Sequence, residues 1–378
     1  MKNNSQIYSM TVCNKDSCSG CFACVESCPK DAINIIDTLD SYNAVIDENK
    51  CIKCGLCYKL CQNNNPIKGK TPILWKQGWS LDSELRAQSS SGGAAQAIEL
   101  AFVKRGGVVC SCSFEEGEFN FSFSNSEDGI KRFSGSKYVK SSPNGVYKKI
   151  KELLASGIKV LFVGLPCQVS AIKKFTNGIN DSNLYTIDLI CHGTPSPQLL
   201  KIFLKQNGIN LATLSNISFR EKNKFQIKNN MKYVGTKGVA DKYTIAFLNS
   251  ISYTDNCYSC KYANLERVSD ITLGDSWGTQ IDLYEQVKGI SLILCQTLKG
   301  RELVENANLH LLDVDLNIAI EHNHQLMHPS PMPSKRRFFF KSIKNGKSFN
   351  SVVRKCYIIQ TLKQIIKCCL IKIKLYKN

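Results

Sequence analysis

Two cysteine runs near the N-terminus have the spacing of ligands to iron–sulfur clusters. In each run three cysteines stand at every third position, and a fourth follows after three more residues. In bacterial two-cluster ferredoxins the fourth cysteine of each run binds the cluster of the other run. The spacing therefore predicts one [4Fe–4S] cluster bound by Cys18, Cys21, Cys24 and Cys61, and a second bound by Cys51, Cys54, Cys57 and Cys28. The chemistry of such a pair is one-electron transfer.

Zinc sites and a disulfide scaffold are the alternatives for these runs. Zinc sites usually pair two CxxC hooks and need no third cysteine at the same spacing. A disulfide scaffold is typical of a much shorter secreted chain with a signal peptide. This chain has 378 residues, and its first residues include no apolar segment of the signal-peptide type. We therefore expect a cytoplasmic protein that keeps its thiols reduced.

Four later cysteines stand in loops: Cys167, Cys191, and the Cys257-x2-Cys260 pair. Cys167 and Cys191 each follow a predicted strand, so their side chains could meet at one edge of a sheet. The four could bind a third cluster. Alternatively, Cys167 or Cys191 is a redox-active thiol and the CxxC pair a dithiol or zinc hook.

The remaining cysteines are assigned no ligand role. Cys13 precedes the first run at the wrong spacing. The others stand among apolar residues and are expected to fill the core; they are Cys110, Cys112, Cys295, Cys356, Cys368 and Cys369.

Helices and apolar strands alternate after the ferredoxin-like segment. Residues 94–104 and 146–156 have helical patterns, while 108–110, 160–163 and 184–190 have those of strands. This alternation predicts an α/β domain with its site at strand carboxyl ends. The expected divisions are a small α+β ferredoxin domain at 1–65, a linker at 66–75, the α/β domain at 76–335 and a basic tail at 336–378.

The formal charge of +18 falls to about +12 to +14 when two or three clusters are bound. No recognised nucleic-acid module accompanies this charge, so nucleic-acid binding is not expected. In the tail, apolar residues recur at helical spacing from Ile358 to Ile373, with Lys363, Lys367 and Lys374 on the other side. Such a helix could lie on the inner face of a membrane, dock a partner, or pack on its own domain.

His192 lies in a glycine–proline loop beside Cys191. It could donate a proton near a flavin or substrate, or it could be a structural residue bonded to the backbone. Asp275 and Trp277 lie in a compact strand-to-turn segment. They are either functional residues or a turn Asp and a core Trp. No GxGxxG occurs in the chain, so a Rossmann dinucleotide site is not supported.

Four stretches, 89–114, 135–172, 188–197 and 253–278, resemble the family formed by the β-subunits of coenzyme F420-dependent hydrogenase and formate dehydrogenase. The resemblance covers about residues 75–330. It implies an α/β domain that binds FAD without a Rossmann motif, and a further [4Fe–4S] cluster held by Cys167, Cys191, Cys257 and Cys260. The flavin contacts that it suggests are Ser91, Gly92, Gly93, Gly135, Ser136, Lys137 and Tyr138. Lys137, which could face a phosphate or the flavin ring, and His192 are the candidate catalytic residues.

The chain departs from the usual pattern at Gln62, where the second run normally has proline; this alters loop stiffness and removes no ligand. The polar segment 221–243 could hold a substrate pocket. The predicted function is an oxidoreductase that passes electrons between a hydride donor or acceptor, coenzyme F420 or an organic substrate, and a ferredoxin-like partner. The alternatives are a ferredoxin-driven reductase of an unsaturated or carbonyl metabolite, such as a sugar or lipid intermediate, and a non-catalytic subunit of a larger complex.

Overall fold

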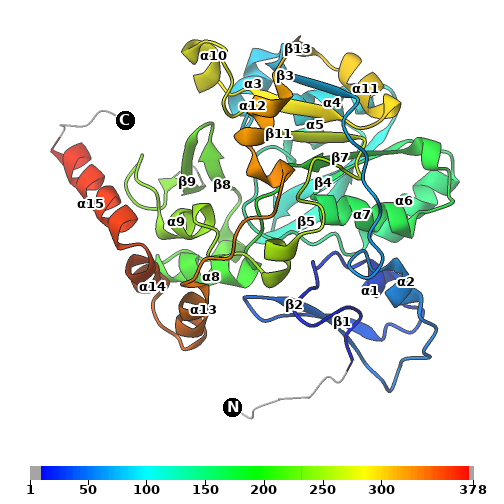
Figure 1. Cartoon of the computed structure of the whole chain (residues 1–378), viewed down its shortest axis with the longest axis horizontal. Helices are drawn as coiled ribbons and strands as arrows, with labels where there is room; N and C mark the ends of the chain where they lie inside the picture. The colour runs from blue at the N-terminus through cyan, green and yellow to red at the C-terminus, as the bar shows by residue number, and fades with distance from the viewer. Residues whose placement is uncertain (1–9, 231, 374–378) are drawn as a thin grey trace.

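The N-terminal unit consists of one hairpin and two short helices. Strands β1 (Ile33–Asp37) and β2 (Tyr42–Ile46) pair antiparallel, and helices α1 (Ala23–Ser27) and α2 (Leu56–Leu60) contact each other. The computed structural model describes residues 10–230 and 232–373. The unit lies beside helix α7 of the larger domain (Figure 1). A small α+β unit carrying the cysteine runs agrees with the sequence prediction.

The two cysteine runs repeat the same backbone conformation. Gly20 and Lys53 have φ of 67° and 57°, and Phe22 and Gly55, two positions later, have φ of 61° and 72°. A positive φ is unfavourable for a bulky residue such as Phe22, so the surrounding packing must hold it there. These left-handed residues turn the chain around each predicted cluster site.

An eight-stranded mixed sheet forms the centre of the larger domain. Its order is β13-β3-β12-β11-β7-β6-β4-β5, and the neighbours β11, β7, β6 and β4 run parallel. The strands are β3 (Leu74–Ser80), β4 (Val108–Glu115), β5 (Glu118–Ser124), β6 (Val160–Gly164), β7 (Leu184–Leu189), β11 (Ile271–Asp275), β12 (Ser291–Cys295) and β13 (Leu309–Leu312). The parallel centre agrees with the predicted α/β class.

Helices cover both faces of this sheet (Figure 1). Successive residues of β6 point to opposite faces of the sheet. Leu161 packs in one core with α4 and α11, whereas Phe162 packs in another core with α6 and α7. These helices are α4 (Ala94–Lys104), α6 (Val146–Ala155), α7 (Pro166–Phe175) and α11 (Leu298–Glu305). Shorter ones are α3 (Ser83–Gln88), α5 (Glu127–Lys131), α10 (Leu283–Val287) and α12 (Leu316–Glu321).

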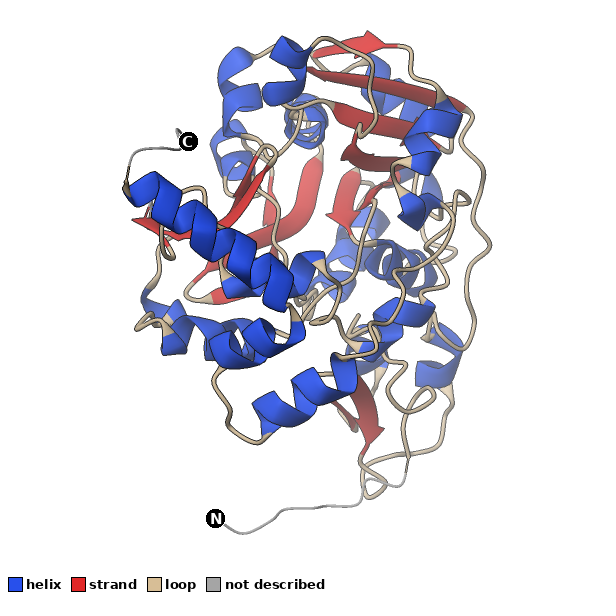
Figure 2. Cartoon of the chain, turned by 60° about the vertical axis from the view of Figure 1, so that its left-hand side comes forward, coloured by secondary structure: helices blue, strands red, loops and turns tan. Residues whose placement is uncertain are grey.

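A second core surrounds a small antiparallel sheet of β8 (Ile217–Glu221), β9 (Lys224–Asn229) and β10 (Lys232–Tyr233). Its helices are α8 (Pro197–Gln206), α9 (Lys242–Leu248), α13 (Arg336–Lys344) and α14 (Phe349–Cys356). The predicted tail is therefore not uniform. Helices α13 and α14 are buried here because Phe339 and Phe349 fill the core, whereas α15 (Ile358–Lys372) lies on the outside (Figure 2).

The predicted linker is anchored where it approaches the large sheet. Lys70 and Arg267 exchange two backbone hydrogen bonds of 2.8 and 3.0 Å. Gly69 packs so closely on this segment that an added Cβ would lie 2.4 Å from the carbonyl oxygen of Glu266. Within the described residues, no helix is both long and apolar enough to cross a membrane.

We expect Phe349→Ala to destabilise the protein by roughly 3–5 kcal/mol, because the ring is fully buried in the second core and its removal leaves a cavity. Thermal unfolding followed by far-UV circular dichroism measures this as a lower midpoint. Leu283→Ala is the matched control, since that side chain is exposed and its loss should change stability by less than about 0.5 kcal/mol. Equal midpoints for the two variants would contradict the assignment of α14 to the core.

Candidate functional site: three groups of cysteines in series

The eight cysteines of the two runs form two groups in the structure. Cys24 lies within electrostatic reach of Cys21 and Cys61, and Cys18 and Cys61 share a core cluster with it. Cys57 lies within reach of the rest of the second group, Cys28, Cys51 and Cys54. The crossed arrangement, in which the last cysteine of each run joins the other run, is the one that the spacing predicts; ligation itself stays a prediction.

Backbone amides point at sulfur atoms at equivalent positions of the two runs. Gly20 N–H donates to Cys18 Sγ and Lys53 N–H to Cys51 Sγ, both at 3.4 Å. Ala32 N–H donates to Cys28 Sγ at 3.3 Å. Hydrogen bonds of this type stabilise a thiolate over a thiol. The first two follow from the left-handed turns at Gly20 and Lys53, and all three suit sulfur atoms that bind iron.

Burial opposes ionisation of these thiols. Burial and the neighbouring thiols raise the pKa of Cys24 well above its usual value. For Cys13, hydrogen bonding with Cys18 is the main reason why its pKa rises to about 12. A coordinated iron reverses this tendency, because a thiol bound to a metal is deprotonated. Cys13 lies beside Cys18 and Cys61 although its spacing is wrong for a ligand, and no sequence signal indicated that proximity.

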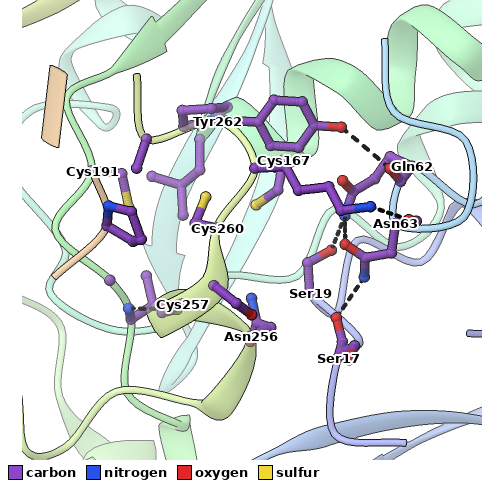
Figure 3. A pocket seen from close by; sticks show the side chains of 18 of the residues that line it. Ser17, Ser19, Gln62, Asn63, Cys167, Cys191, Asn256, Cys257, Cys260 and Tyr262 are labelled. Atoms are coloured by element: carbon purple, nitrogen blue, oxygen red, sulfur yellow. Dashed lines mark hydrogen bonds between the residues drawn. The ribbon is translucent and has the colours of Figure 1, made fainter. Parts of the chain in front are cut away.

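The four later cysteines line one cavity of about 210 Å³. Cys167 is the second residue of α7, Cys191 follows the last parallel-paired residues of β7, and Cys257 and Cys260 lie in and just after a 3₁₀ turn, Asp255–Ser259. Figure 3 shows the four side chains around the opening. Because β6 and β7 are adjacent and parallel, the residues that follow them meet at one edge of the sheet.

Burial also dominates the chemistry of this cavity. It raises the pKa of Cys191 to about 12, and Cys257 and Cys260 add to the shift. The ammonium of Lys140, which also lines the cavity, partly offsets the rise in the pKa of Cys167. Cys257 Sγ accepts from Thr194 N–H at 3.4 Å. Four thiols around a cavity, with an amide and a cation nearby, fit a group that carries negative charge.

Within residues 10–230 and 232–373, no three His, Cys, Asp or Glu side chains are close enough to hold a single metal ion. A [4Fe–4S] cluster is held differently, by four thiolates on separate irons around a cube. The cavity between Cys167, Cys191, Cys257 and Cys260 has the donors for such a cluster, and their ligand role stays a prediction.

The ferredoxin unit forms one wall of this cavity. Cys21 lies within electrostatic reach of Cys167, and Tyr262 lies near both. The Tyr262 hydroxyl donates to Ser170 Oγ at 2.7 Å and lies 3.4 Å from the Gln62 carbonyl (Figure 3). The first cysteine group and the four-cysteine cavity are thus direct neighbours.

Gln62 helps to join these parts. Its buried side-chain amide donates to Ser19 Oγ at 2.9 Å, and Lys140 Nζ donates to the Ser19 carbonyl at the same distance. The sequence suggested only an effect on loop stiffness at residue 62. The structure shows a polar contact between the two cysteine runs, which proline could not make.

The predicted flavin-contact residues lie in two neighbouring loops. Gly92 has no room for a side chain, because a Cβ would lie 2.5 Å from the Gly78 carbonyl oxygen. Gly93, the residue just before α4, has φ of 86°. Ser136 N–H donates to Ser90 Oγ at 2.8 Å, which brings the second loop to the first. The structure therefore places Ser91–Gly93 near Gly135–Tyr138, and their contact with a flavin stays a prediction.

Lys137 and Tyr138 point in different directions. Lys137 Nζ donates to the carbonyls of Phe133, Ser134 and Gly135 at 2.8 to 3.1 Å, and burial lowers its pKa. Tyr138 stacks on Phe247 with ring centroids 4.3 Å apart. In this arrangement Lys137 closes its own loop, while Tyr138 contributes to an aromatic cluster.

Two cations that sequence reasoning missed reach across to these loops from the β8–β9 hairpin. Arg220 donates to both carboxylate oxygens of Asp275 at 2.7 and 2.9 Å and to the Ser90 carbonyl at 2.9 Å. Lys222 Nζ donates to the carbonyls of Ser89 at 2.7 Å, Ser91 at 2.9 Å and Arg86. The sequence indicated only that the polar segment 221–243 could hold a substrate pocket and named neither cation, because such long-range partners leave no local pattern.

Lys222 has carbonyl partners and two cationic neighbours. Burial lowers its pKa to about 8, and Arg86 and Arg220 contribute to the shift. Arg86 pairs with Glu285 and Arg220 with Asp275, whereas no described carboxylate lies within ion-pair distance of Lys222. Cations gathered at a glycine turn fit a ligand with phosphate groups, and the aromatic rings of Tyr138, Phe225 and Trp277 lie around Arg220.

His192 lies between the cysteine cavity and this cationic region. Its ring lines the cavity, and Nδ1 is 2.9 Å from the side-chain amide of Gln325. Partial burial lowers the pKa of His192, and His324 adds to the effect, so the imidazole is neutral at pH 7. Since the Gln325 amide donates, Nδ1 accepts and Nε2 carries the proton.

Two family models match parts of the chain. Residues 17–65 match the family model of the 4Fe-4S dicluster domain, and residues 157–313 match that of the C terminus of the coenzyme F420 hydrogenase/dehydrogenase beta subunit. The first of these matches lies in the N-terminal unit, and the second covers less than half of the chain, within the larger domain. The chain is an iron–sulfur protein related to oxidoreductases.

Two curated relatives have matching segments. A subunit of the F(420)H(2) dehydrogenase of Methanosarcina mazei is 24% identical over 191 residues, which cover 48% of this chain and 54% of the relative. Coenzyme F420-dependent sulfite reductase of Methanocaldococcus jannaschii is 24% identical over 312 residues, 76% of this chain and 45% of the relative. The chain thus spans about half the length of these relatives.

Among solved structures, a chain of the F420-reducing [NiFe] hydrogenase complex from Methanosarcina barkeri is similar. It has 20% sequence identity and a TM-score of 0.49, and the match covers 69% of this chain and 92% of that chain.

We expect Cys13→Ala to retain the clusters, whereas Cys18→Ser should lose one, which is about four irons per chain. Both thiols are buried side by side, so comparison of the two variants separates the effect of losing a ligand from the effect of changing a buried side chain. Iron and sulfide content of anaerobically purified protein, with electron paramagnetic resonance of the reduced state, measures the outcome. Loss of the same amount of iron in both variants would make Cys13 a ligand.

Proposed function

We propose that this protein is a flavin- and iron–sulfur-dependent oxidoreductase that passes electrons between a one-electron carrier and a hydride donor or acceptor. The observation that carries the proposal is the order of the cysteine groups. The group of Cys28, Cys51, Cys54 and Cys57 is partly exposed. The group of Cys18, Cys21, Cys24 and Cys61 is buried, and this buried group adjoins the four-cysteine cavity. Clusters in these places would form a relay from the surface to the cationic loops.

The exposed end of this relay suits an acidic protein carrier. Cys54 is exposed, and the exposed side chains beside it include Ile52, Tyr58, Lys53 and Lys59. No acidic residue occurs between residues 49 and 65. Apolar contacts surrounded by lysines favour docking of a negatively charged partner and increase its association rate. A ferredoxin-like carrier has the required charge and redox chemistry.

The inner end is the proposed flavin site. Lys222 and Arg220 would face the phosphates, and the Ser91–Gly93 turn and Tyr138 would position the remainder. A bound flavin exchanges a hydride with one partner and single electrons with another. His192 Nε2–H could hold or deliver a proton, because Gln325 occupies the other ring nitrogen. Lys137 would act by fixing the 133–138 loop through its three carbonyl contacts.

Coenzyme F420 is the proposed hydride partner, because both curated relatives carry it in their names. The test uses anaerobically purified protein reconstituted with iron, sulfide and FAD. Addition of reduced F420 should bleach the flavin and cluster absorbance within the mixing time of a stopped-flow instrument. Absence of bleaching in protein with confirmed flavin and cluster content would reject F420 as the hydride donor.

A non-catalytic electron-transfer subunit is the second candidate. It is favoured by the name of one curated relative, which is itself a subunit. Reduction of a dye by the isolated protein, with a hydride donor as the electron source, decides between the enzyme and the electron-transfer subunit. A relay subunit would accept electrons from dithionite but would not oxidise any hydride donor. Reduction of an unsaturated or carbonyl substrate by reduced ferredoxin, without F420, would instead support a ferredoxin-driven reductase.

We expect Cys54→Ser to abolish turnover driven by a ferredoxin-like carrier while the bound flavin remains reducible by dithionite. The outermost predicted cluster would be lost, and the inner site would be unchanged. Cys369→Ser is the matched control, because Cys369 is also exposed but lies on α15. The prediction that Cys369 fills the core was wrong, since α15 lies on the outside of the small-sheet core. Carrier-driven turnover is measured anaerobically with each variant; full activity of Cys54→Ser would show that electrons do not enter there.

We expect FAD binding to weaken as the pH rises above about 8. The pKa of Lys222 is about 8 without a ligand, and a bound phosphate favours the charged ammonium, so affinity is full below this pH and falls above it. Titration calorimetry at pH 7 and pH 9.5 compares the parent with Lys222→Met, in which this dependence should disappear. Lys205→Met, on exposed α8 surface, is the control. An unchanged pH dependence in Lys222→Met would place the phosphates elsewhere.

A further inference from the structure

Helix α15 presents its apolar side to solvent. The large aliphatic residues in and just after it have exposed fractions between 45% and 69%; they are Ile358, Ile359, Leu362, Ile365, Ile366 and Ile373. At 100° per residue these positions fall on one stripe of the helix. The apolar stripe of a helix in a globular protein normally faces the core, and here it faces away from it.

The contacts on the opposite side fix this orientation. Thr361 is buried, Gln364 Oε1 accepts from Ala240 N–H at 2.9 Å, and Cys368 Sγ lies 3.3 Å from Thr236 Oγ1. These residues form a second, narrow stripe that attaches α15 to the small-sheet core. Figure 2 shows the helix along the outside of that core. The apolar stripe cannot turn inward without breaking these contacts.

The surroundings of the stripe are basic. After Glu321 the chain contains 13 Lys and Arg residues and no Asp or Glu. Lys363 and Lys372 are exposed and lie on opposite borders of the apolar stripe, as the helical angle places them. An apolar stripe between lysines is typical of helices that lie in the interface of an anionic membrane.

We propose that α15 binds the surface of an anionic lipid bilayer, with the aliphatic stripe between the lipid headgroups and Lys363 and Lys372 facing their phosphates. With 15 residues the helix is about 22 Å long, which is shorter than the bilayer core of about 30 Å, so it lies on the surface. Protein interfaces are enriched in aromatic residues and Arg and depleted in Lys. Residues 358–373 contain Lys and no aromatic residue or Arg, which favours lipid over a protein partner.

Co-sedimentation of the full-length holoprotein with vesicles tests the proposal. We expect binding to vesicles with about one-third phosphatidylglycerol and at least about tenfold weaker binding to pure phosphatidylcholine. The variant I359S/L362S/I366S should lose at least about tenfold in affinity for the anionic vesicles. The matched control is L283S/V287S/L298S, which removes three exposed aliphatic side chains from α10 and α11 and should bind as the parent does.

A charge variant gives a second readout that does not depend on the apolar substitutions. K363Q/K372Q should weaken binding to the anionic vesicles by about fivefold per lysine, and added salt should have a smaller effect on this variant than on the parent. Unchanged binding of I359S/L362S/I366S would overturn the proposal, as would equal binding of the parent to neutral vesicles. A parent that binds no vesicle but forms a dimer, dissociated by the same triple substitution, would overturn it too and make the stripe an interface between copies.

Discussion

Burial of thiols at the carboxyl edge of the parallel strands is the constraint on which the rest of the structure depends. Cys167 and Cys191 follow β6 and β7, and the loop that carries Cys257 and Cys260 closes the cavity. Thiolates in such a place are costly without a compensating charge. The ferredoxin unit lies against this cavity. Its first cysteine group is next to Cys167, and its residues Ser19 and Gln62 line the cavity. A direct contact of this kind would suit electron transfer between the predicted clusters.

The cationic loops are held by a different set of interactions. Arg220 and Lys222 come from the β8–β9 hairpin of the small sheet. Their partners lie elsewhere, because Ser90 and Ser91 precede α4 and Asp275 ends β11 of the large sheet. A buried bidentate ion pair such as Arg220–Asp275 orients both groups, and removal of either partner would leave an uncompensated charge. The site is therefore assembled between two cores, and its geometry depends on how the small sheet packs against the large one.

Sequence reasoning located features whose determinants are local. The cysteine groups follow from spacing within a run, and the parallel strands from apolar segments bounded by glycine. It failed where distant residues decide the outcome. Arg220 and Asp275 are 55 positions apart and Lys222 and Ser91 are 131 apart, so no window along the chain brings them together. Cys13 was set aside because its spacing is wrong, although a turn of the chain brings it beside Cys18. The tail showed a basic amphipathic pattern throughout, but only packing could separate the buried α13 and α14 from the exposed α15.

The exposed side chains of α15 and those around Cys54 form two separate surfaces, for which we propose different partners. Helix α15 lies on the opposite side of the molecule from α1 and α2 of the ferredoxin unit (Figure 1). If α15 rests on a bilayer, the partly exposed cysteine group around Cys54 stays accessible from the aqueous side. Lysines near Cys54 would then recruit an acidic carrier, and lysines beside the α15 stripe would recruit anionic lipid, by the same long-range attraction. Salt should weaken both contacts, but only the second also depends on aliphatic side chains, which is why charge and apolar variants of α15 have to be measured separately.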